Sequence, residues 1–182
     1  DSPTLLVSFA RSGNSPESVA AMELTDRLVT DAHHLVITCN EDGALMQAAK
    51  RSGCGHVLLT PEGTNDKGFA MTSSFTSMLY AGYAAFVGPA ELDTRVGGIA
   101  AATHAVLDEY AEMIRALAAR PYRRTVFLGS GCFKGLAQEA ALKLLELTDG
   151  EQVTAFDTPL GFRHGPKVIV NSETLVIIFV SN

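Results

Sequence analysis

Val7-Ser8-Phe9-Ala10-Arg11-Ser12-Gly13-Asn14-Ser15-Pro16-Glu17 joins an apolar, strand-like run to the start of a helix. Ser15 is a favourable helix cap, Pro16 suits the first helical position and Glu17 places an acid in the first turn. The apolar residues that follow keep a helical spacing: Val19, Met22, Leu24 and Leu28. The stretch therefore predicts a strand, a tight Ser/Gly turn and a helix, in that order.

The same alternation continues along the chain. Strands are predicted at residues 5–9, 35–38, 56–59, 125–128, 153–155 and 175–180. Helices are predicted from residue 15, over 42–52, 72–87, 98–119 and 134–148, and briefly after Pro166. Strands that alternate with helices predict an α/β fold with parallel sheets flanked by helices.

A break near residues 119–124 divides this pattern into two parts. An Ala-rich helix ends before Pro121, and a new strand follows it. We predict a first domain over residues 1–120 and the start of a second over residues 121–182. A strand at the very start and no helix after the last strand indicate a piece of a larger chain, with both domains truncated.

Composition narrows the functional classes. The chain has 182 residues, 47% of them apolar, and its longest apolar run, residues 175–180, is far too short for a membrane span. A net charge of −6 and a single Arg123-Arg124 pair argue against nucleic acid or an anionic membrane as partner. Three cysteines without CxxC spacing argue against a disulfide framework and favour a reducing, cytoplasmic location.

Residues 11–15 are the first candidate site. Ligands of open α/β sheets bind at the carboxyl ends of strands, where helix N-termini favour phosphate. Arg11, two serines and Gly13 predict a phosphate cradle, and neither a P-loop nor a GxGxxG motif is present. The alternative, that Ser15 only caps a helix and Gly13 only turns the chain, remains open.

The helix predicted over residues 134–148 carries the second candidate. Glu139, Lys143, Glu146 and Gly150 share one narrow stripe, while apolar residues cover the rest, so we expect this helix to be mostly buried. A carboxylate beside a Lys in a partly dry cleft is a candidate general base next to a carbonyl. The alternative is a plain Glu139–Lys143 pair with Glu146 facing water.

Two further motifs are weaker. His164 lies in a Gly/Pro turn and can transfer protons near neutral pH, although a loop His is often only solvated. Residues 71–76 form a hydroxyl-rich helix start that could close over a sugar or merely cap the helix. The other histidines are interpreted as structural, and no spacing supports a metal site or a Gly-x-Ser-x-Gly nucleophile.

The order of these motifs resembles that of double sugar isomerase (SIS) domain proteins. The motifs are Ser8 to Ser15, Met71-Thr72-Ser73-Ser74-Phe75-Thr76, Gly129-Ser130-Gly131, Glu139 to Glu146 and His164-Gly165-Pro166. The resemblance covers the whole chain and extends to the isomerase half of glucosamine-6-phosphate synthase. It is greatest for the branch called tagatose-6-phosphate ketose/aldose isomerase, also described as galactosamine-6-phosphate deaminase/isomerase.

The resemblance implies which residues bind substrate. Ser12 and Ser15, with Arg11, Gly13 and Asn14, match the loop that binds the sugar phosphate, and Ala10 stands where that loop has its first Ser. Thr72 and Ser73 match the loop that lines the sugar. Ser130 and Glu139 complete the expected substrate-binding set. The family's first domain also opens with a strand and a phosphate-contacting loop that have no counterpart in these residues.

The resemblance also implies the catalytic groups. Glu146 matches the carboxylate that moves the proton between C1 and C2, Lys143 is its neighbour on the helix, and His164 matches the ring-opening residue. In the synthase this His comes from the partner subunit, so a homodimer is implied. The chemistry requires neither a metal nor an organic cofactor.

The predicted function is therefore an aldose/ketose isomerase of a hexose 6-phosphate. An amino sugar phosphate, galactosamine 6-phosphate, is the favoured substrate, with release of ammonia to give tagatose 6-phosphate. Simple isomerisation of tagatose 6-phosphate is one alternative. A phosphosugar sensor without turnover is another, against which the presence of both Glu146 and His164 argues.

Overall fold

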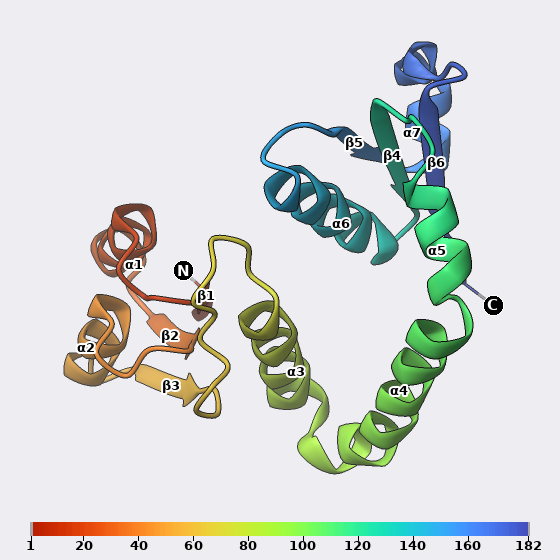
Figure 1. The fold of residues 1–182 in the computed structure, drawn as a ribbon. Coiled ribbons are helices and arrows are strands. Elements are labelled where there is room, and N and C mark those ends of the chain that lie inside the picture. The colour runs from red at the N-terminus through yellow and green to blue at the C-terminus, as the bar shows by residue number, and fades with distance from the viewer. Residues whose placement is uncertain (1, 182) are drawn as a thin grey trace. The chain divides into compact units, whose positions relative to one another are not determined.

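A computed structural model describes residues 2–181 of the chain (Figure 1). Its contacts divide into two compact units, one up to Gly98 and one from Ile99 onward. Because the division falls within a helix, the predicted domain boundary at residue 120 stays a prediction. Across the part of the chain that the structure describes, no helix has the length and apolar character needed to cross a membrane.

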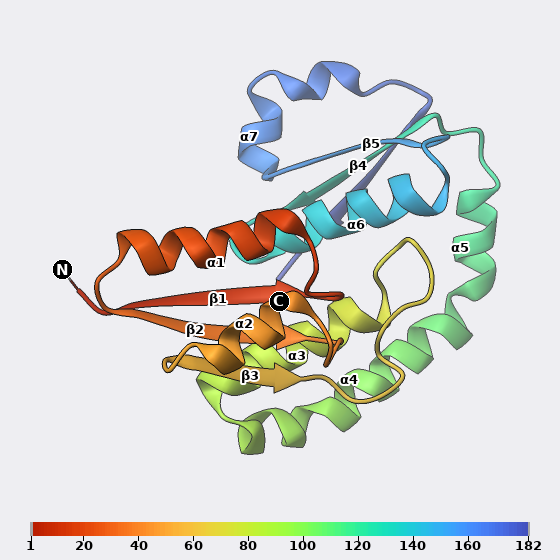
Figure 2. The ribbon, with the colours of Figure 1, turned by 90° about the vertical axis from the view of Figure 1, so that its left-hand side faces the viewer.

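The first unit contains one parallel sheet of order β1-β2-β3, seen as three arrows in Figure 2. Its elements are β1 (Thr4–Ala10), α1 (Pro16–Leu28), β2 (Ala32–Thr38), α2 (Ala44–Arg51), β3 (Gly55–Leu59) and α3 (Ser73–Val87). In the register, Ala10 lies beside Thr38, and Thr38 beside Leu59. The three strands therefore end at one level, which brings the loops that follow them together.

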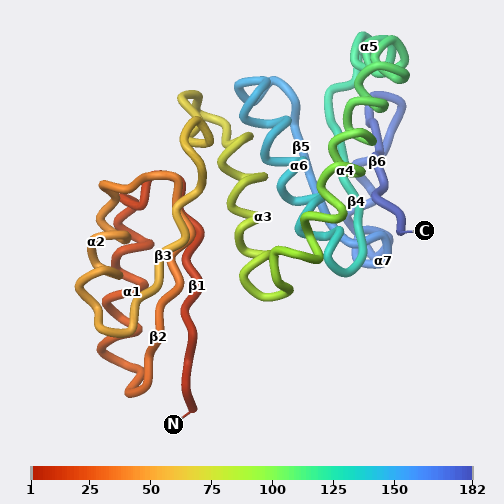
Figure 3. The backbone as a smooth tube through the Cα atoms, turned by 90° about the horizontal axis from the view of Figure 1, so that it is seen from below, coloured from red at the N-terminus to blue at the C-terminus, as the bar shows by residue number. Residues whose placement is uncertain are grey.

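Helices cover both faces of this sheet (Figure 3). On one face α1 and α2 pack on the strands through a core that includes Met22, Val36 and Leu45. On the other face α3 comes so close that a Cβ on Gly82 would lie 2.8 Å from the ring of Phe9. Glycine at this position thus permits close packing of the helix on the sheet.

The second unit has a parallel sheet of order β5-β4-β6. After α4 (Pro89–Glu109), which spans the division between the units, come α5 (Ala111–Ala118), β4 (Arg124–Gly129), α6 (Phe133–Leu147), β5 (Val153–Asp157), α7 (Pro159–Arg163), the 3₁₀ helix η1 (Pro166–Ile169) and β6 (Thr174–Phe179). The parallel strands and flanking helices of both units confirm the predicted α/β fold.

Alternate residues of β4 face two separate cores in this second unit. Phe127 packs with Ala137 and Ala141 of α6. Val126 and Leu128, which point to the other face, pack with Phe162 of α7. Consecutive strand residues point to opposite faces, so α6 and α7 cover opposite sides of the sheet.

Strand prediction succeeded and helix prediction succeeded in part. All six predicted strands are present, and the short helix after Pro166 is the 3₁₀ helix η1. The single helix predicted over residues 98–119 is wrong, because α4 and α5 are separated at Tyr110, whose φ and ψ are −107° and 2°. The helix also begins earlier, since Gly88 (φ 99°) ends α3 and Pro89 starts α4.

The expectation that α6 is mostly buried is also wrong for the described chain. Only Ala137 and Ala141 of this helix are buried. Four of its leucines are exposed: Leu136, Leu142, Leu145 and Leu147. An apolar helix surface predicts burial, but α6 packs on the sheet through a narrow strip of mostly small residues, with Leu144 beside them.

Candidate functional site

The β1–α1 turn (residues 11–15) connects the carboxyl end of β1 to the amino end of α1. Gly13 has a φ of 68°, a left-handed conformation that favours glycine. A Cβ on Gly13 would also lie 3.3 Å from the Cα of Gly43, in the loop after β2. Gly13 is therefore required twice, for the turn and for the close approach of the neighbouring loop.

That neighbouring loop holds the turn through its polar groups. Asn40 Nδ2 donates a hydrogen bond of 2.8 Å to the carbonyl oxygen of Ser12. Asn14 Oδ1 accepts one of 2.9 Å from the backbone N–H of Ala44, at the start of α2. The amide side chains of two loops thus fix the turn from both directions.

The turn leaves hydrogen-bond donors available to a ligand. The hydroxyl of Ser12 accepts a bond from the N–H of Asn14 and keeps its own proton free to donate. Ser15 is the N-cap residue of α1, as predicted, but its exposed side chain makes no capping bond. Two hydroxyls at a helix N-terminus make a suitable place for a phosphate group.

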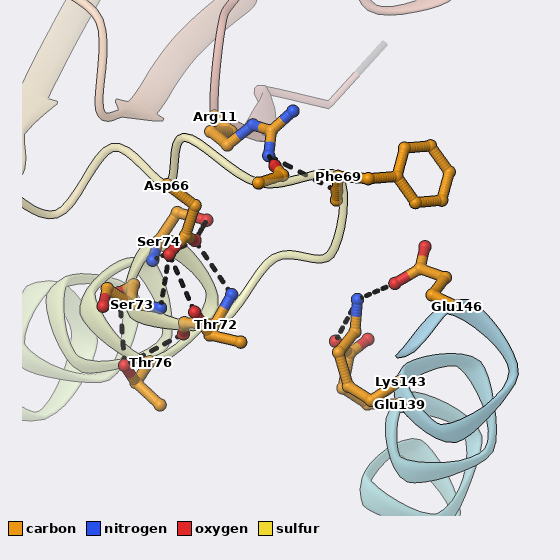
Figure 4. A network of polar contacts seen from close by, with 11 residues as sticks. Arg11, Asp66, Phe69, Thr72, Ser73, Ser74, Thr76, Glu139, Lys143 and Glu146 are labelled. Atoms are coloured by element: carbon orange, nitrogen blue, oxygen red, sulfur yellow. Dashed lines mark hydrogen bonds and ion pairs between the residues drawn. The ribbon is translucent and has the colours of Figure 1, made fainter. Parts of the chain in front are cut away.

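The β3–α3 loop (residues 60–72) leads to the predicted sugar-lining residues, and Asp66 organises it (Figure 4). Its carboxylate accepts hydrogen bonds from the N–H groups of Thr72 (2.8 Å), Ser73 (3.1 Å) and Ser74 (2.9 Å) and from the hydroxyls of Thr72 (2.8 Å) and Ser74 (2.6 Å). These bonds, chiefly those from Ser74, hold the pKa of the Asp66 carboxyl well below its usual range.

Asp66 therefore provides the cap of α3. Thr72 occupies the N-cap position, yet its side chain makes no capping bond. The three N–H groups that the helix start leaves unpaired are satisfied instead by a carboxylate six to eight residues earlier in the chain. The simple capping role expected of residues 71–76 is thus performed by a residue outside that motif.

Arg11 connects the two segments of this site. Its Nη1 donates to the carbonyl oxygens of Gly68 (2.9 Å) and Phe69 (3.5 Å), both in the β3–α3 loop. The contact is drawn in Figure 4. One edge of the guanidinium therefore holds the loop against the β1–α1 turn.

In the second unit, Glu139, Lys143 and Glu146 of α6 form a charged triad (Figure 4). Lys143 Nζ lies 3.5 Å from Glu139 Oε1 and makes a short hydrogen bond to Glu146 Oε2. The three side chains are only 17–21% exposed. The plain alternative is thus half right, because the Glu139–Lys143 pair forms but Glu146 is ion-paired instead of facing water.

This triad has the composition of an acid–base centre. It contains two carboxylates and one ammonium group, so one carboxylate is in excess. A carboxylate held beside a Lys in a partly screened place can act as a base. The structure thus brings together three residues that the sequence predicted as neighbours.

The β4–α6 turn (residues 130–132) contains the predicted residue Ser130. Ser130 is exposed, and its hydroxyl makes no hydrogen bond to any of residues 2–181. Gly129 before it is confined, because a Cβ there would lie 2.2 Å from the carbonyl oxygen of Phe133. The strand–turn–helix path is therefore fixed while the serine side chain stays available.

His164 follows α7 and is exposed. Within the described residues its side chain makes no hydrogen bond or ion pair. It lies next to the helix that covers one face of the sheet, whereas the triad belongs to α6 on the other face. The unit by itself does not bring His164 to Glu146.

Several other titratable residues form local pairs, such as Arg95–Glu91 and Tyr80–Asp93. His34, interpreted as structural, is buried at 1% exposure and its Nε2 lies 2.6 Å from Asp26 Oδ1. Among residues 2–181 no group of three or more His, Cys, Asp or Glu side chains could hold a metal ion. The three cysteines are free.

Sequence reasoning missed Asp66 and Asn40. Both lie in irregular loops and act on residues 6 to 28 positions away. Hydrophobic periodicity carries no information about such loops. The one available signal was the acid six residues before a hydroxyl-rich helix start.

Two parallel α/β sheets with strand–Ser/Gly–helix turns define the class of fold, which solved structures share. The C-terminal domain of glucosamine-fructose-6-phosphate aminotransferase from Francisella tularensis aligns with a TM-score of 0.80 at 20% identity, over 100% of this chain and 53% of that one. At this identity the similarity shows the fold alone. No protein-family model matches the chain.

Two closer relatives make the assignment more specific. D-galactosamine-6-phosphate deaminase AgaS of Escherichia coli is 48% identical over 99% of this chain and 47% of its own length. The crystal structure of tagatose-6-phosphate ketose/aldose isomerase from Escherichia coli aligns with a TM-score of 0.88 at 47% identity, over 98% of this chain and 49% of that one. The chain is homologous to part of these proteins, which confirms the resemblance to their branch of the double SIS family. It spans about half their length.

Proposed function

We propose that the full-length protein is an aldose/ketose isomerase that converts galactosamine 6-phosphate to tagatose 6-phosphate and ammonia. The observation that carries the proposal is the charged triad, in which Lys143 holds two carboxylates on one side of α6. An isomerase needs one base that can remove and return a proton, and the triad supplies it. The name of the Escherichia coli deaminase agrees with this substrate.

The β1–α1 turn is proposed to bind the phosphate. Ser12 and Ser15 offer hydroxyl protons at the N-terminus of α1, and Arg11, Gly13 and Asn14 shape the turn. Anchoring the phosphate dianion orients the carbon chain and restricts its motion before any bond is broken. Thr72 and Ser73 are proposed to line the sugar, with Ser130 and Glu139 as further contacts.

Glu146 is proposed to transfer the proton. In the open-chain sugar it removes the C2 proton, which the C1 carbonyl acidifies, and an enol forms between C1 and C2. Return of the proton to C1 leaves an imine at C2, which water converts to the ketone as ammonia departs. Lys143 holds Glu146 in place through a short hydrogen bond, and water is the only other reactant.

His164 is proposed to open the sugar ring from a second subunit. Support comes from the second unit, where α6 and the segment containing His164 cover opposite faces of one sheet. A His that its own unit keeps on the other face can serve a triad in a partner chain. The proposed enzyme is therefore a homodimer, and three free cysteines agree with a cytoplasmic location.

Ammonia release is the decisive experiment. The full-length protein is assayed with galactosamine 6-phosphate, and glucosamine 6-phosphate serves as the comparison. Ammonia from the galacto sugar alone supports the proposal and assigns the epimer. Ammonia from neither sugar overturns the deaminase proposal.

Simple isomerisation is the second candidate. It is favoured by one observation, the name of the Escherichia coli structure, tagatose-6-phosphate ketose/aldose isomerase. The proposed phosphate turn and triad suit both reactions, because neither determines the substituent on C2 of the sugar. Conversion of tagatose 6-phosphate to its aldose without ammonia release would establish this alternative.

A further inference from the structure

The β3–α3 loop is long and irregular, yet it is held at several points. At its start the N–H of Thr60 donates to the carbonyl oxygen of Thr38 (2.9 Å), and the hydroxyls of Thr60 and Thr64 lie 2.7 Å apart. Arg11 holds the carbonyl oxygens of Gly68 and Phe69. Long loops that are this well ordered are commonly functional.

Asp66 lies at the centre of this ordering and determines how Thr72 can bond. An ionised carboxylate only accepts hydrogen bonds, so the Thr72 hydroxyl must donate its single proton to Asp66 Oδ1. Two lone pairs remain on the Thr72 oxygen. Thr72 is exposed, so it can offer a ligand an acceptor but no donor.

The two serines beside Thr72 behave differently. Ser74 is fully buried, and its hydroxyl is also committed to Asp66. Ser73 is exposed, and its hydroxyl makes no hydrogen bond to the rest of the described chain. Of these three consecutive hydroxyls, that of Ser74 is therefore fully committed to Asp66. That of Thr72 can only accept a further hydrogen bond, and that of Ser73 can donate or accept.

We infer that Asp66 is a positioning residue of the sugar-phosphate site that keeps Thr72 as an acceptor for a donor group of the sugar. The fitting group is a hydroxyl or an ammonium substituent on the carbon chain. Arg11 links Asp66 and Thr72 to the β1–α1 turn, because its side chain binds the β3–α3 loop in which Asp66 lies. The inference rests on the proposed function, in which Thr72 lines the sugar.

Binding measurements on the full-length protein test the inference separately from turnover. Tagatose 6-phosphate and inorganic phosphate are titrated by calorimetry into the wild type, Asp66→Asn, Thr72→Val and the double variant. Glu62→Gln is the matched control, since it is an exposed acid in the same loop whose side chain makes no hydrogen bond within the described chain. Thermal melting verifies that each variant is folded.

In Asp66→Asn the new amide donates toward the hydroxyls, so Thr72 loses its fixed acceptor role. We expect the Kd for tagatose 6-phosphate to rise about tenfold, the effect of one well-placed hydrogen bond, and the Kd for inorganic phosphate to change less than about twofold. Thr72→Val should have the same effect. The double variant should be no weaker than either single one, because both remove the same interaction.

Three results would overturn the inference. An equal rise in the Kd of both ligands in Asp66→Asn would show a general structural role. Additive losses of affinity in the double variant would show that Asp66 does not act through Thr72. A tenfold rise in the Kd of tagatose 6-phosphate in Glu62→Gln would show that the effect is not specific to Asp66. A wild type that binds tagatose 6-phosphate but turns over no sugar phosphate contradicts only the proposed function.

Discussion

The β1–α1 turn and the β4–α6 turn follow the same pattern of strand, Ser/Gly turn and helix, but they are built differently. In the first, Asn40, Asn14 and Gly43 fix the turn against the next loop. In the second, Gly131 has a φ of 58° and a Cβ there would meet nothing within 4 Å. The same local motif is enclosed in one unit and open in the other.

The difference bears on the roles proposed for the two segments. A phosphate site needs donors that are held still, because ordering them at binding would cost affinity. The backbone of the first turn meets this requirement, and the second unit carries the charged triad of α6. This contrast is the basis for proposing that the first turn binds the phosphate and that the triad transfers the proton.

Glu146→Gln gives the largest expected effect and separates the two roles. The amide cannot accept the C2 proton, so turnover of galactosamine 6-phosphate should fall at least about 100-fold, within the range for loss of a general base. The Kd for the sugar phosphate should change little. Ammonia release and calorimetry measure the two quantities. Glu151→Gln is the control, because Glu151 is an exposed acid after α6. Undiminished turnover in Glu146→Gln would show that Glu146 is not the base.

Glycine substitutions test the contrast between the turns directly. Gly13→Ala places a Cβ 3.3 Å from Gly43 in a left-handed conformation, so the turn must move and phosphate affinity should fall about tenfold or more. Gly131→Ala carries only the conformational cost of about 1–2 kcal/mol. Calorimetry with inorganic phosphate and denaturant unfolding report both effects. Equal losses of affinity would mean that the turns are equivalent.

Serine substitutions should give a smaller contrast. Ser15→Ala removes a hydroxyl available to the phosphate, and a hydrogen bond to a charged group is worth about 1.5 kcal/mol at the lower end, so the Kd should rise about tenfold. Ser130→Ala should raise the Kd by less. The two Kd values for tagatose 6-phosphate are measured side by side. A larger loss at Ser130 would reverse the assignment of the anchor.

The pH dependence of Asp66 gives the smallest effect. Its pKa in the folded state lies below the ordinary value of 3.8, so its contribution to stability is fully present above about pH 4 and is lost as the pH falls through the lowered value. The difference in unfolding free energy between the wild type and Asp66→Asn should therefore shrink from pH 6 to pH 3. A difference that grows on acidification would contradict the assignment of the carboxylate as the helix cap.

Local signals were sufficient for the strands and for most helices. Each predicted strand is a short apolar run between turn residues, and all six are present. The helix over 98–119 failed because an Ala-rich sequence continues through Tyr110 without a breaker residue, while the backbone there leaves the helical region. The helix α7 was not predicted, since its five residues are too few for periodicity to appear.

The sequence by itself determined the α/β class, the strand–turn–helix units and the i,i+3 and i,i+4 spacing that brings Lys143 to its two glutamates, because all of these depend on residues close together in the chain. Only the tertiary structure decided that Asn40 fixes the Ser12 carbonyl, that Asp66 caps α3 and that α6 and α7 lie on opposite faces of a sheet. Those features depend on hydrogen bonds between loops and on strand order, and parallel sheets align loop ends that lie far apart in the chain.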